Sequence, residues 1–366
     1  MSGFLTEAFA GRSVLVTGHT GFKGSWLALW LARMGARVTG YALAPPTCPS
    51  NFEASFVRDV LTAHHEADIR DADKLSKAVR MSAPSVIFHL AAQSLVRDSY
   101  RDPRQTFDVN VMGTVILLEC VRTLRHSCVI LVVTSDKCYE NQEKMEGYKE
   151  TDPMGGFDPY SASKGAAEIA IASYRRSFFN PARLQDHGVK LASARAGNVI
   201  GGGDWAPDRI GTDIVNALCV GRPVPVRNPR AIRPWQHVLE PLSGYLTVVA
   251  RMLTSDDPKW CRAWNFGPSP EEQLTVAELV KLYCSAWGQG NWKDMSCPSA
   301  PHEAGILRLN IDQAVRKLSW RPRWTIAEAV ARTVDWYRVF YQTRSASMRE
   351  HCLADITAYE STAAGP

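Results

Sequence analysis

Short apolar runs alternate with helix-like segments through the first half of the chain. Continuous apolar runs of this kind are typical of strands that are buried on both faces. We predict strands at residues 13–18, 36–42, 85–92, 128–135 and 189–201, and a further short strand that ends within 66–71. We predict helices at residues 25–35, 71–82, 103–124 and 159–179. This alternation predicts an α/β fold built on a doubly wound parallel sheet.

Beyond residue 201 the chain becomes rich in glycine, proline and tryptophan, as in GGGDWAPDRIG and GRPVPVRNPRAIRPWQHV. Such loop-rich segments carry functional groups more often than they build a core. We therefore predict a cofactor-binding domain at 1–195, to which some later segments return, and a smaller substrate-binding domain at 196–350. Residues 351–366, which include ITAYESTAAGP, are predicted to be a frayed, flexible tail.

Composition and charge describe an ordinary globular protein. Of its 366 residues, 45% are hydrophobic and 22% charged, and 42 basic against 37 acidic residues leave a net charge of +5. This mild bias is compatible with a small anionic substrate and is weak evidence for nucleic acid or membrane binding. The nine cysteines are odd in number and form no C-x-x-C pair, which favours reduced thiols over disulfides or zinc. The same cysteine pattern gives no reason to expect a metal site. The first residues lack an apolar signal core, so we expect a soluble, cytoplasmic protein.

A glycine-rich loop joins the first predicted strand to the first predicted helix. Gly18, Gly21 and Gly24 have the spacing G-x-x-G-x-x-G, with Thr20, Phe22 and Lys23 between them. A loop in this position lets backbone N–H groups approach a pyrophosphate and predicts a Rossmann-like dinucleotide site. The acidic residue expected after the second strand is missing, so the loop does not decide between NAD and NADP. Asp68 and Ile69 either hold the adenine, or Asp68 caps the following helix.

Two clusters of reactive side chains follow. The stretch VTSDKCYEN places Thr134, Ser135, Asp136 and Lys137 at the exit of a buried strand, where parallel sheets keep their ligands. In DPYSASK, Tyr160 and Lys164 are four residues apart on one helix face. A tyrosine acts as a base near neutral pH only if its phenolate is stabilised, and a lysine one turn along supplies the charge.

Together these motifs resemble the extended short-chain dehydrogenase/reductase family, whose nucleotide-sugar members use a Ser/Thr–Tyr–Lys triad. Within the family, the likeness is strongest to the nucleotide-sugar 4,6-dehydratases that act on CDP-glucose. It rests on the blocks GHTGFKGSWL, HLAAQSLVRDSY, VTSDKCYEN, DPMGGFDPYSASK, RAGNVIGGGDW and RPWQHV. The resemblance implies NAD as cofactor, CDP-glucose as substrate, a homodimer or dimer of dimers, and dideoxysugar synthesis for the O-antigen of bacterial lipopolysaccharide.

Such a dehydratase oxidises C4 of the hexose, removes water across C5 and C6 and returns the hydride to C6. The resemblance makes Tyr160 the base at the C4 hydroxyl, assisted by Lys164 and Ser135. Asp136 is then the acid for the departing C6 hydroxyl. Lys137 either takes the C5 proton as a neutral amine or stabilises the enolate as a cation. The plain alternative is that Asp136 and Lys137 form a surface ion pair.

The remaining expected contacts are assigned by the same resemblance. Further cofactor contacts are expected from Leu90, Ala91, Ala92, Asn110 and Thr134. Substrate contacts are expected from Gln93, Ser94, Ser135, Asn198, Asp204, Trp205, Arg209, Arg233 and Glu303. The competing functions are an epimerase or ketoreductase of the same fold, which has no need of the Asp136–Lys137 pair, and a non-catalytic dinucleotide sensor, which has no need of the triad.

Overall fold

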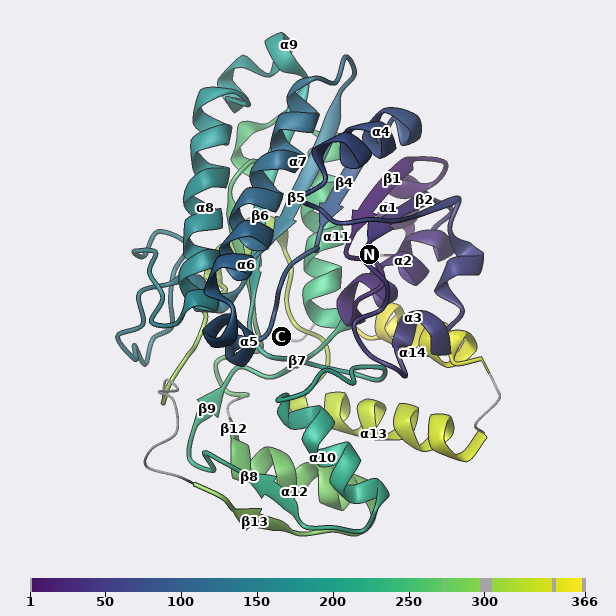
Figure 1. Cartoon of the computed structure of the whole chain (residues 1–366), viewed down its shortest axis with the longest axis vertical. Helices are drawn as coiled ribbons and strands as arrows, with labels where there is room; N and C mark the ends of the chain where they lie inside the picture. Colours follow the sequence, from purple (N-terminus) through teal and green to yellow (C-terminus); the bar gives the residue numbers. More distant parts are fainter. Residues whose placement is uncertain (1, 273, 297–304, 344–346, 364–366) are drawn as a thin grey trace.

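The computed structural model describes residues 2–272, 274–296, 305–343 and 347–363, and it centres on one parallel sheet (Figure 1). The seven strands lie in the order β11-β6-β5-β4-β1-β2-β3. They are β1 (Ser13–Thr17), β2 (Arg37–Ala42), β3 (Ala63–Glu66), β4 (Val86–His89), β5 (Cys128–Val133), β6 (Val189–Ala196) and β11 (Ala263–Phe266). The order reverses between β1 and β4, which is where a doubly wound sheet binds its ligands. The predicted fold class is confirmed.

Helices cover both faces of this sheet. One face carries α1 (Ser2–Phe9), α2 (Phe22–Arg33), α11 (Leu239–Thr254) and α14 (Arg349–Ser361); the other carries α4 (Ala72–Ser82), α7 (Gly113–Arg122) and α8 (Pro159–Ser177). Successive residues of β5 enter the two cores alternately: Val129 and Leu131 face the first group of helices, and Ile130 and Val132 face the second. Burial on both faces explains why this strand is apolar throughout.

The rest of the chain forms a smaller part at the carboxyl ends of the strands, in the lower half of Figure 1. Its helices are α10 (Ile210–Cys219), α12 (Val276–Trp287) and α13 (Ile326–Thr343). Its short strands pair as β7 (Val199–Ile200) with β10 (Gln236–His237), β8 (Val224–Val226) with β13 (Trp292–Asp294), and β9 (Ile232–Arg233) with β12 (Leu274–Thr275). Three later segments, α11, β11 and α14, join the first part instead.

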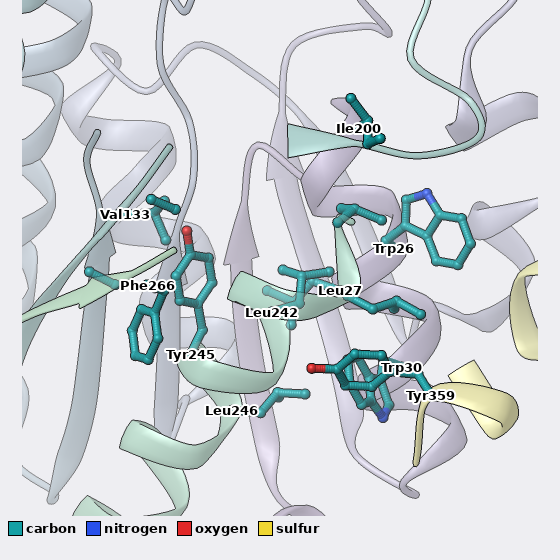
Figure 2. Packing of buried hydrophobic residues seen from close by; sticks show 14 of the residues in the cluster. Trp26, Leu27, Trp30, Val133, Ile200, Leu242, Tyr245, Leu246, Phe266 and Tyr359 are labelled. Atoms are coloured by element: carbon teal, nitrogen blue, oxygen red, sulfur yellow. The ribbon is translucent and has the colours of Figure 1, made fainter. Parts of the chain in front are cut away.

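The prediction of a flexible tail from residue 351 is wrong as far as residue 361. These residues form most of α14, whose buried side chains include Cys352, Ile356 and Tyr359. The Trp30 indole N–H donates to Glu360 Oε1 over 2.8 Å, and the rings of Trp30 and Tyr359 meet edge to face at 5.8 Å (Figure 2). The buried residues Cys352, Asp355, Ile356 and Tyr359 lie on one helix face, but this face includes a carboxylate, which weakens the apolar pattern in the sequence.

Several smaller differences concern element boundaries. The predicted helix at 103–124 is interrupted: α6 (Pro103–Phe107) passes into a π-helical turn at Asp108–Met112 before α7 begins. The third strand ends at Glu66, so Asp68 and Ile69 lie in the following loop. Neither α1 nor β11 was predicted. In the described part of the chain, none of the helices has the length and apolar character that crossing a membrane requires.

Glu240 on α11 is a buried carboxylate that ties the C-terminal helix to the body of the protein. Its Oε1 accepts the backbone N–H groups of Arg323 at 2.9 Å and Trp324 at 2.8 Å. Its Oε2 accepts the hydroxyl of Tyr359 at 2.6 Å. Burial nevertheless raises the pKa of Glu240 to about 7.

Replacing Glu240 with Gln should make the protein less sensitive to alkali. As pH rises, the unfolded chain, with a glutamate pKa of 4.5, loses this proton before the folded protein does. The free energy of unfolding of the wild type should therefore fall by about 2 kcal/mol more than that of Glu240→Gln between pH 5 and pH 7.5. Urea unfolding at both pH values measures the difference. The exposed Glu7→Gln should behave as wild type, and a Glu240→Gln protein that does so as well would contradict the prediction.

Candidate active site

A large cleft follows the carboxyl edge of the sheet. Its volume is about 1610 Å³, whereas a pocket for one small ligand typically measures ~300–1,000 Å³. It is lined by the loops after β1, β4, β5 and β6 and by the facing loops of the smaller part. The cleft has room for two ligands side by side, which is what a cofactor and a separate substrate require.

The glycine loop forms one wall of the cleft. Gly18 has a φ of +76°, and a Cβ there would lie 2.6 Å from the backbone nitrogen of Ala91. A Cβ on Gly24 would lie 2.1 Å from the carbonyl oxygen of Gly18, so helix α2 starts directly against the loop. A Cβ on Gly21 would meet only that carbonyl oxygen, at 3.4 Å. Gly21 caps α2 without a side-chain acceptor, so the first N–H groups of the helix are free to bind a phosphate.

The far end of this wall lies at the ends of β2 and β3. The Thr20 hydroxyl donates to the carbonyl of Leu43 over 2.9 Å, and Leu43 itself is 59% exposed. Asp68 and Ile69 both line the cleft. The Asp68 carboxylate pairs with Arg70, which lowers its pKa. Helix α4 is capped by Asp71, which accepts the Lys74 N–H at 3.0 Å, so the alternative that Asp68 is this cap is wrong.

The loop after β4 forms the floor of the cleft. Leu90, Ala91, Ala92, Gln93 and Ser94 all line the cleft. Asn110 holds this loop in place, because its Oδ1 accepts the Gln93 N–H at 2.9 Å and its Nδ2 donates to Ser163 Oγ at 2.8 Å. The amide of Gln93 is itself used within the loop, where it donates to the carbonyl of Leu95. The side chains of Asn110 and Gln93 thus stabilise the backbone of the loop after β4 by hydrogen bonds.

The predicted triad is assembled where β5 meets α8. Asp158 caps α8 by accepting the Ser161 N–H at 3.0 Å, which presents Tyr160 to the cleft in the first turn. A hydrogen bond with Ser135 lowers the pKa of Tyr160, but burial outweighs it and raises that pKa to about 12. The Lys164 ammonium lies 6.0 Å from the centre of the Tyr160 ring. Burial lowers the pKa of Lys164 to about 8.

Asp136 and Lys137 have different surroundings although they are adjacent. Asp136 is 2% exposed; its Oδ1 accepts the Ser135 hydroxyl at 3.0 Å, and its Oδ2 has no partner in the described part of the chain. Burial raises the pKa of Asp136 in spite of the nearby Lys137, Arg233 and Lys23 charges. Lys137 is half-buried and lines the cleft. Since Asp136 is buried, the alternative of a surface ion pair is wrong.

The smaller part supplies the opposite wall, and most of its predicted contacts already have protein partners. Arg209 pairs with Asp204 at 2.8 Å and donates to Ser94 Oγ at 3.1 Å, which bridges the two walls. Arg233 donates to the carbonyls of Ile232 and Gly305.

Three further predicted substrate residues belong to the same wall or lie beyond what is described. Trp205 packs against Trp336 and Phe340 and donates to the Tyr341 hydroxyl at 3.2 Å. Asn198 lines the cleft. Glu303 lies outside the residues that the structure describes.

Two arginines that sequence reasoning missed also line the cleft. Arg97 in α5 (Val96–Arg101) and Arg227 after β8 both pair with the carboxylate of Asp208, at 3.3 and 2.8 Å. Asp208 therefore joins the two walls at a second point. The only sequence signal for Arg97 was its place in the block HLAAQSLVRDSY, and Arg227 was one of several arginines in its loop.

Two substitutions in the glycine loop should separate effects on the stability of the protein from effects on dinucleotide binding. Gly24→Ala should lower the free energy of unfolding by about 1–3 kcal/mol, because its Cβ collides with backbone that cannot move away freely. Gly21→Ala should change it by less than ~0.5 kcal/mol, since its φ of −77° suits alanine. The same methyl group occupies the phosphate approach, so dinucleotide affinity should fall at least ~10-fold. Urea unfolding and a binding titration measure both effects; a Gly21→Ala protein that binds normally would contradict this placement.

Comparisons with known proteins agree with this geometry. The sequence model of the family described as GDP-mannose 4,6 dehydratase matches residues 15–333. The chain is 50% identical over 330 residues to a CDP-glucose 4,6-dehydratase of Salmonella typhimurium, covering 90% of this chain and 91% of that protein. It is 26% identical over 341 residues to a dTDP-glucose 4,6-dehydratase of Xanthomonas campestris, covering 88% and 92%.

Solved structures share the fold. A dTDP-glucose 4,6-dehydratase of Bacillus anthracis in complex with NAD superposes with a TM-score of 0.74 at 20% identity, covering 90% of this chain and 97% of that one. A dTDP-glucose 4,6-dehydratase of Streptomyces venezuelae with NAD bound has a TM-score of 0.74 at 23% identity, covering 89% and 96%.

Proposed function

The chain belongs to the GDP-mannose 4,6 dehydratase family, and from this membership we propose that it is a CDP-glucose 4,6-dehydratase, a hydro-lyase that uses NAD. It converts CDP-D-glucose to CDP-4-keto-6-deoxy-D-glucose. The observation that carries the proposal is the buried Asp136, whose unpartnered oxygen lies beside an assembled Ser135–Tyr160–Lys164 triad. Oxidation alone needs only the triad, whereas loss of water also needs an acid.

The residues along the cleft fit NAD. The loop from Gly18 to Gly24 would hold the pyrophosphate, and Asp68 and Ile69 would lie beside the adenosine. Further contacts would come from Leu90, Ala91, Ala92, Thr134, Tyr160 and Lys164, while Asn110 supports the loop beneath them. Bound NAD supplies the hydride acceptor for C4, the hydride donor for C6 and the positive charge of its oxidised ring.

The first proton transfer belongs to Tyr160, which takes the proton of the C4 hydroxyl. Burial raises its pKa to about 12, so the phenol loses its proton near neutral pH even less readily than an ordinary tyrosine. Positive charge near the ring and the hydrogen bond with Ser135 act in the opposite direction. The positive groups that this chain supplies are Arg209, whose charge lowers the pKa of Tyr160, and the Lys164 ammonium, 6.0 Å from the ring centre. Tyr160 is therefore a base only when those charges are present.

The elimination of water uses Asp136 and Lys137, which follow the end of β5. Once C4 is a ketone, the C5 proton becomes acidic and the C6 hydroxyl can leave as water. Asp136 donates the proton to that hydroxyl, which suits a carboxyl whose pKa is raised by burial. Lys137 either removes the C5 proton or stabilises the negative charge of the enolate. C6 then receives the hydride and C5 regains a proton, which completes the reaction without net oxidation.

The two alternatives have less support. An epimerase or ketoreductase of the same fold leaves the buried Asp136 without a task. A non-catalytic dinucleotide sensor leaves the contact of Ser135 with Tyr160 unexplained. Substrate contacts from Ser94, Asn198, Asp204, Trp205, Arg209 and Arg233 remain part of the proposal, since all of them line the cleft.

A homodimer is the proposed assembly, or a dimer of dimers. Helices α7 and α8 lie side by side on one flank of the molecule (Figure 1). Apolar side chains are exposed in these elements: Met112, directly before α7, is 48% exposed and Ile169 on α8 is 61% exposed. A shared apolar flank of this kind is typical of an interface. We also propose that the enzyme acts in the cytoplasm and that its product feeds dideoxysugar synthesis for O-antigen, as the resemblance implies.

Incubation with CDP-glucose deuterated at C4 tests the function directly. A CDP-glucose 4,6-dehydratase should form a 4-keto-6-deoxy sugar with deuterium in its new methyl group and without net NADH, both visible by NMR and absorbance. TDP- and GDP-glucose serve as comparison substrates for the choice of base. Turnover of CDP-glucose without loss of water would favour the epimerase or ketoreductase, and no turnover of any of these sugars would favour the sensor.

Asp136→Asn should separate oxidation from elimination. The amide cannot donate a proton as an acid, so the rate of water loss should fall by ~10²–10⁴-fold, while C4 oxidation continues and reduced cofactor accumulates. Rapid-mixing absorbance and product NMR measure the two steps. Asp71→Asn, in the cap of α4, is the control. Equal loss of both steps in Asp136→Asn would contradict the acid role.

Lys137 variants address the C5 step. If Lys137 is the base, Lys137→Glu should retain part of the elimination rate with a more acidic pH profile, and Lys137→Ala should retain little. If it only stabilises charge, glutamate should be worse than alanine.

Ile169→Asp should dissociate the proposed dimer, because a carboxylate cannot be buried unpaired in an apolar interface. Sedimentation equilibrium at micromolar concentration measures the mass. Met81→Asp, a 68% exposed position on α4, is the control. A monomeric wild type would contradict the assembly.

A further inference from the structure

Behind the triad lies a fully buried ion pair that the proposed reaction does not use. Glu168 on α8 is 2% exposed and Arg195 on β6 is 4% exposed, and their side chains meet at 2.8 Å. Glu168 Oε1 also accepts the Thr134 hydroxyl at 2.5 Å, and its Oε2 accepts the Ser193 hydroxyl at 2.8 Å. One carboxylate thus joins α8 to the end of β5 and to β6.

Arg195 extends this hydrogen-bond network to the segment that follows Lys137. It donates to the Tyr139 hydroxyl at 2.6 Å and to the carbonyl of Glu150 at 3.2 Å. The Tyr139 hydroxyl in turn donates to Asn265 Oδ1 on β11 at 2.8 Å. Tyr139 follows the turn at Asp136–Cys138, so both ends of the Ser135–Lys137 segment are anchored to the same pair.

We propose that Glu168, held by Arg195, is a positioning residue that keeps Lys164 charged and sets the distance between Ser135 and Tyr160. The proposal rests on the function proposed above. Thr134 is the neighbour of Ser135 in the chain, and Glu168 lies one helical turn after Lys164 and two after Tyr160 on the same face of α8. The Thr134–Glu168 hydrogen bond therefore fixes the strand end that carries the serine against the helix that carries the tyrosine and the lysine.

The charges around Lys164 explain why a carboxylate is needed. Burial lowers the pKa of Lys164 to about 8. Glu168 on the same helix and Cys138 in the turn after β5 act to raise this pKa. The other groups that face Lys164 are Tyr160 on α8, His89 on β4 and Lys23 on α2.

Among these groups, Glu168 is the carboxylate that opposes the loss of the lysine proton. Its own pKa is lowered by the charge and hydrogen bond of Arg195 and by the Thr134 and Ser193 hydroxyls, so that it stays ionised. The nearby Arg175 on α8 also interacts with it.

Glu168→Gln tests the proposal through the pH profile. The variant keeps the shape of the side chain but removes the charge, so the alkaline limb of kcat/KM should move down by about one pH unit. At pH 8, which is close to the pKa of Lys164, kcat should fall ~5-fold with a smaller change in KM. Ser193→Ala is the matched control, because it removes one hydrogen bond from the same carboxylate and leaves its charge. An equal shift in Ser193→Ala, or no shift in Glu168→Gln, would overturn the proposal.

A second variant covers the possibility that Glu168→Gln does not fold, since it leaves Arg195 buried without a counter-ion. Glu168→Gln combined with Arg195→Met removes the pair as a unit and should restore folding, as judged by circular dichroism. The restored protein should still have the shifted alkaline limb. A folded double variant with the wild-type pH profile would show that the pair is needed for folding only.

A measurement independent of activity distinguishes failure of this proposal from failure of the proposed function. In a double-mutant cycle of Lys164→Met with Glu168→Gln, thermal unfolding should reveal a coupling between the two residues at pH 7 that has disappeared at pH 9.5, where Lys164 is neutral. If the wild type does not turn over CDP-glucose, the proposed function fails while this cycle still tests the pair. A coupling that is absent at pH 7, or equal at both pH values, would overturn the proposal.

Discussion

The structure depends on the burial of β5 on both faces. Because Val129 and Leu131 pack into one core and Ile130 and Val132 into the other, the strand can present polar groups only where it ends. That end is the carboxyl edge of a parallel sheet, beside the reversal of strand order. The residues that follow, Thr134 to Lys137, therefore meet the glycine loop from β1 and the first turns of α8 at one place.

Burial also determines how the reactive groups differ from one another. It raises the pKa of Asp136 and Tyr160 and lowers that of Lys164, so each is moved toward its neutral form. For an acid that donates to a leaving hydroxyl this is an advantage. For the tyrosine and the lysine it is a cost, which the charges around them must offset. The buried Glu168–Arg195 pair lies next to this group and connects it to three strands of the sheet.

Arginine side chains bridge the two walls of the cleft, one by a hydrogen bond and one by an ion pair. Arg209 and Arg97 reach across to Ser94 and Asp208, respectively. Both contacts are partly exposed and therefore of modest strength in water. They hold the walls together without making the cleft inaccessible to an anionic substrate, whose phosphates compete for the same guanidinium groups.

The sequence by itself predicted six strands of the sheet, the glycine loop, the Tyr160–Lys164 pair and the Ser135–Asp136–Lys137 segment, because each depends on residues that are close together in the chain or at helical spacing. It also indicated the family, which the comparisons confirm. Only the tertiary structure decided that residues up to 361 form a docked helix and that Asp208 bridges Arg97 and Arg227. The Glu168–Arg195 pair belongs to the same group. These features join segments far apart in the chain, and whether a charged residue is buried, paired or exposed depends on neighbours that local patterns of hydrophobicity do not specify.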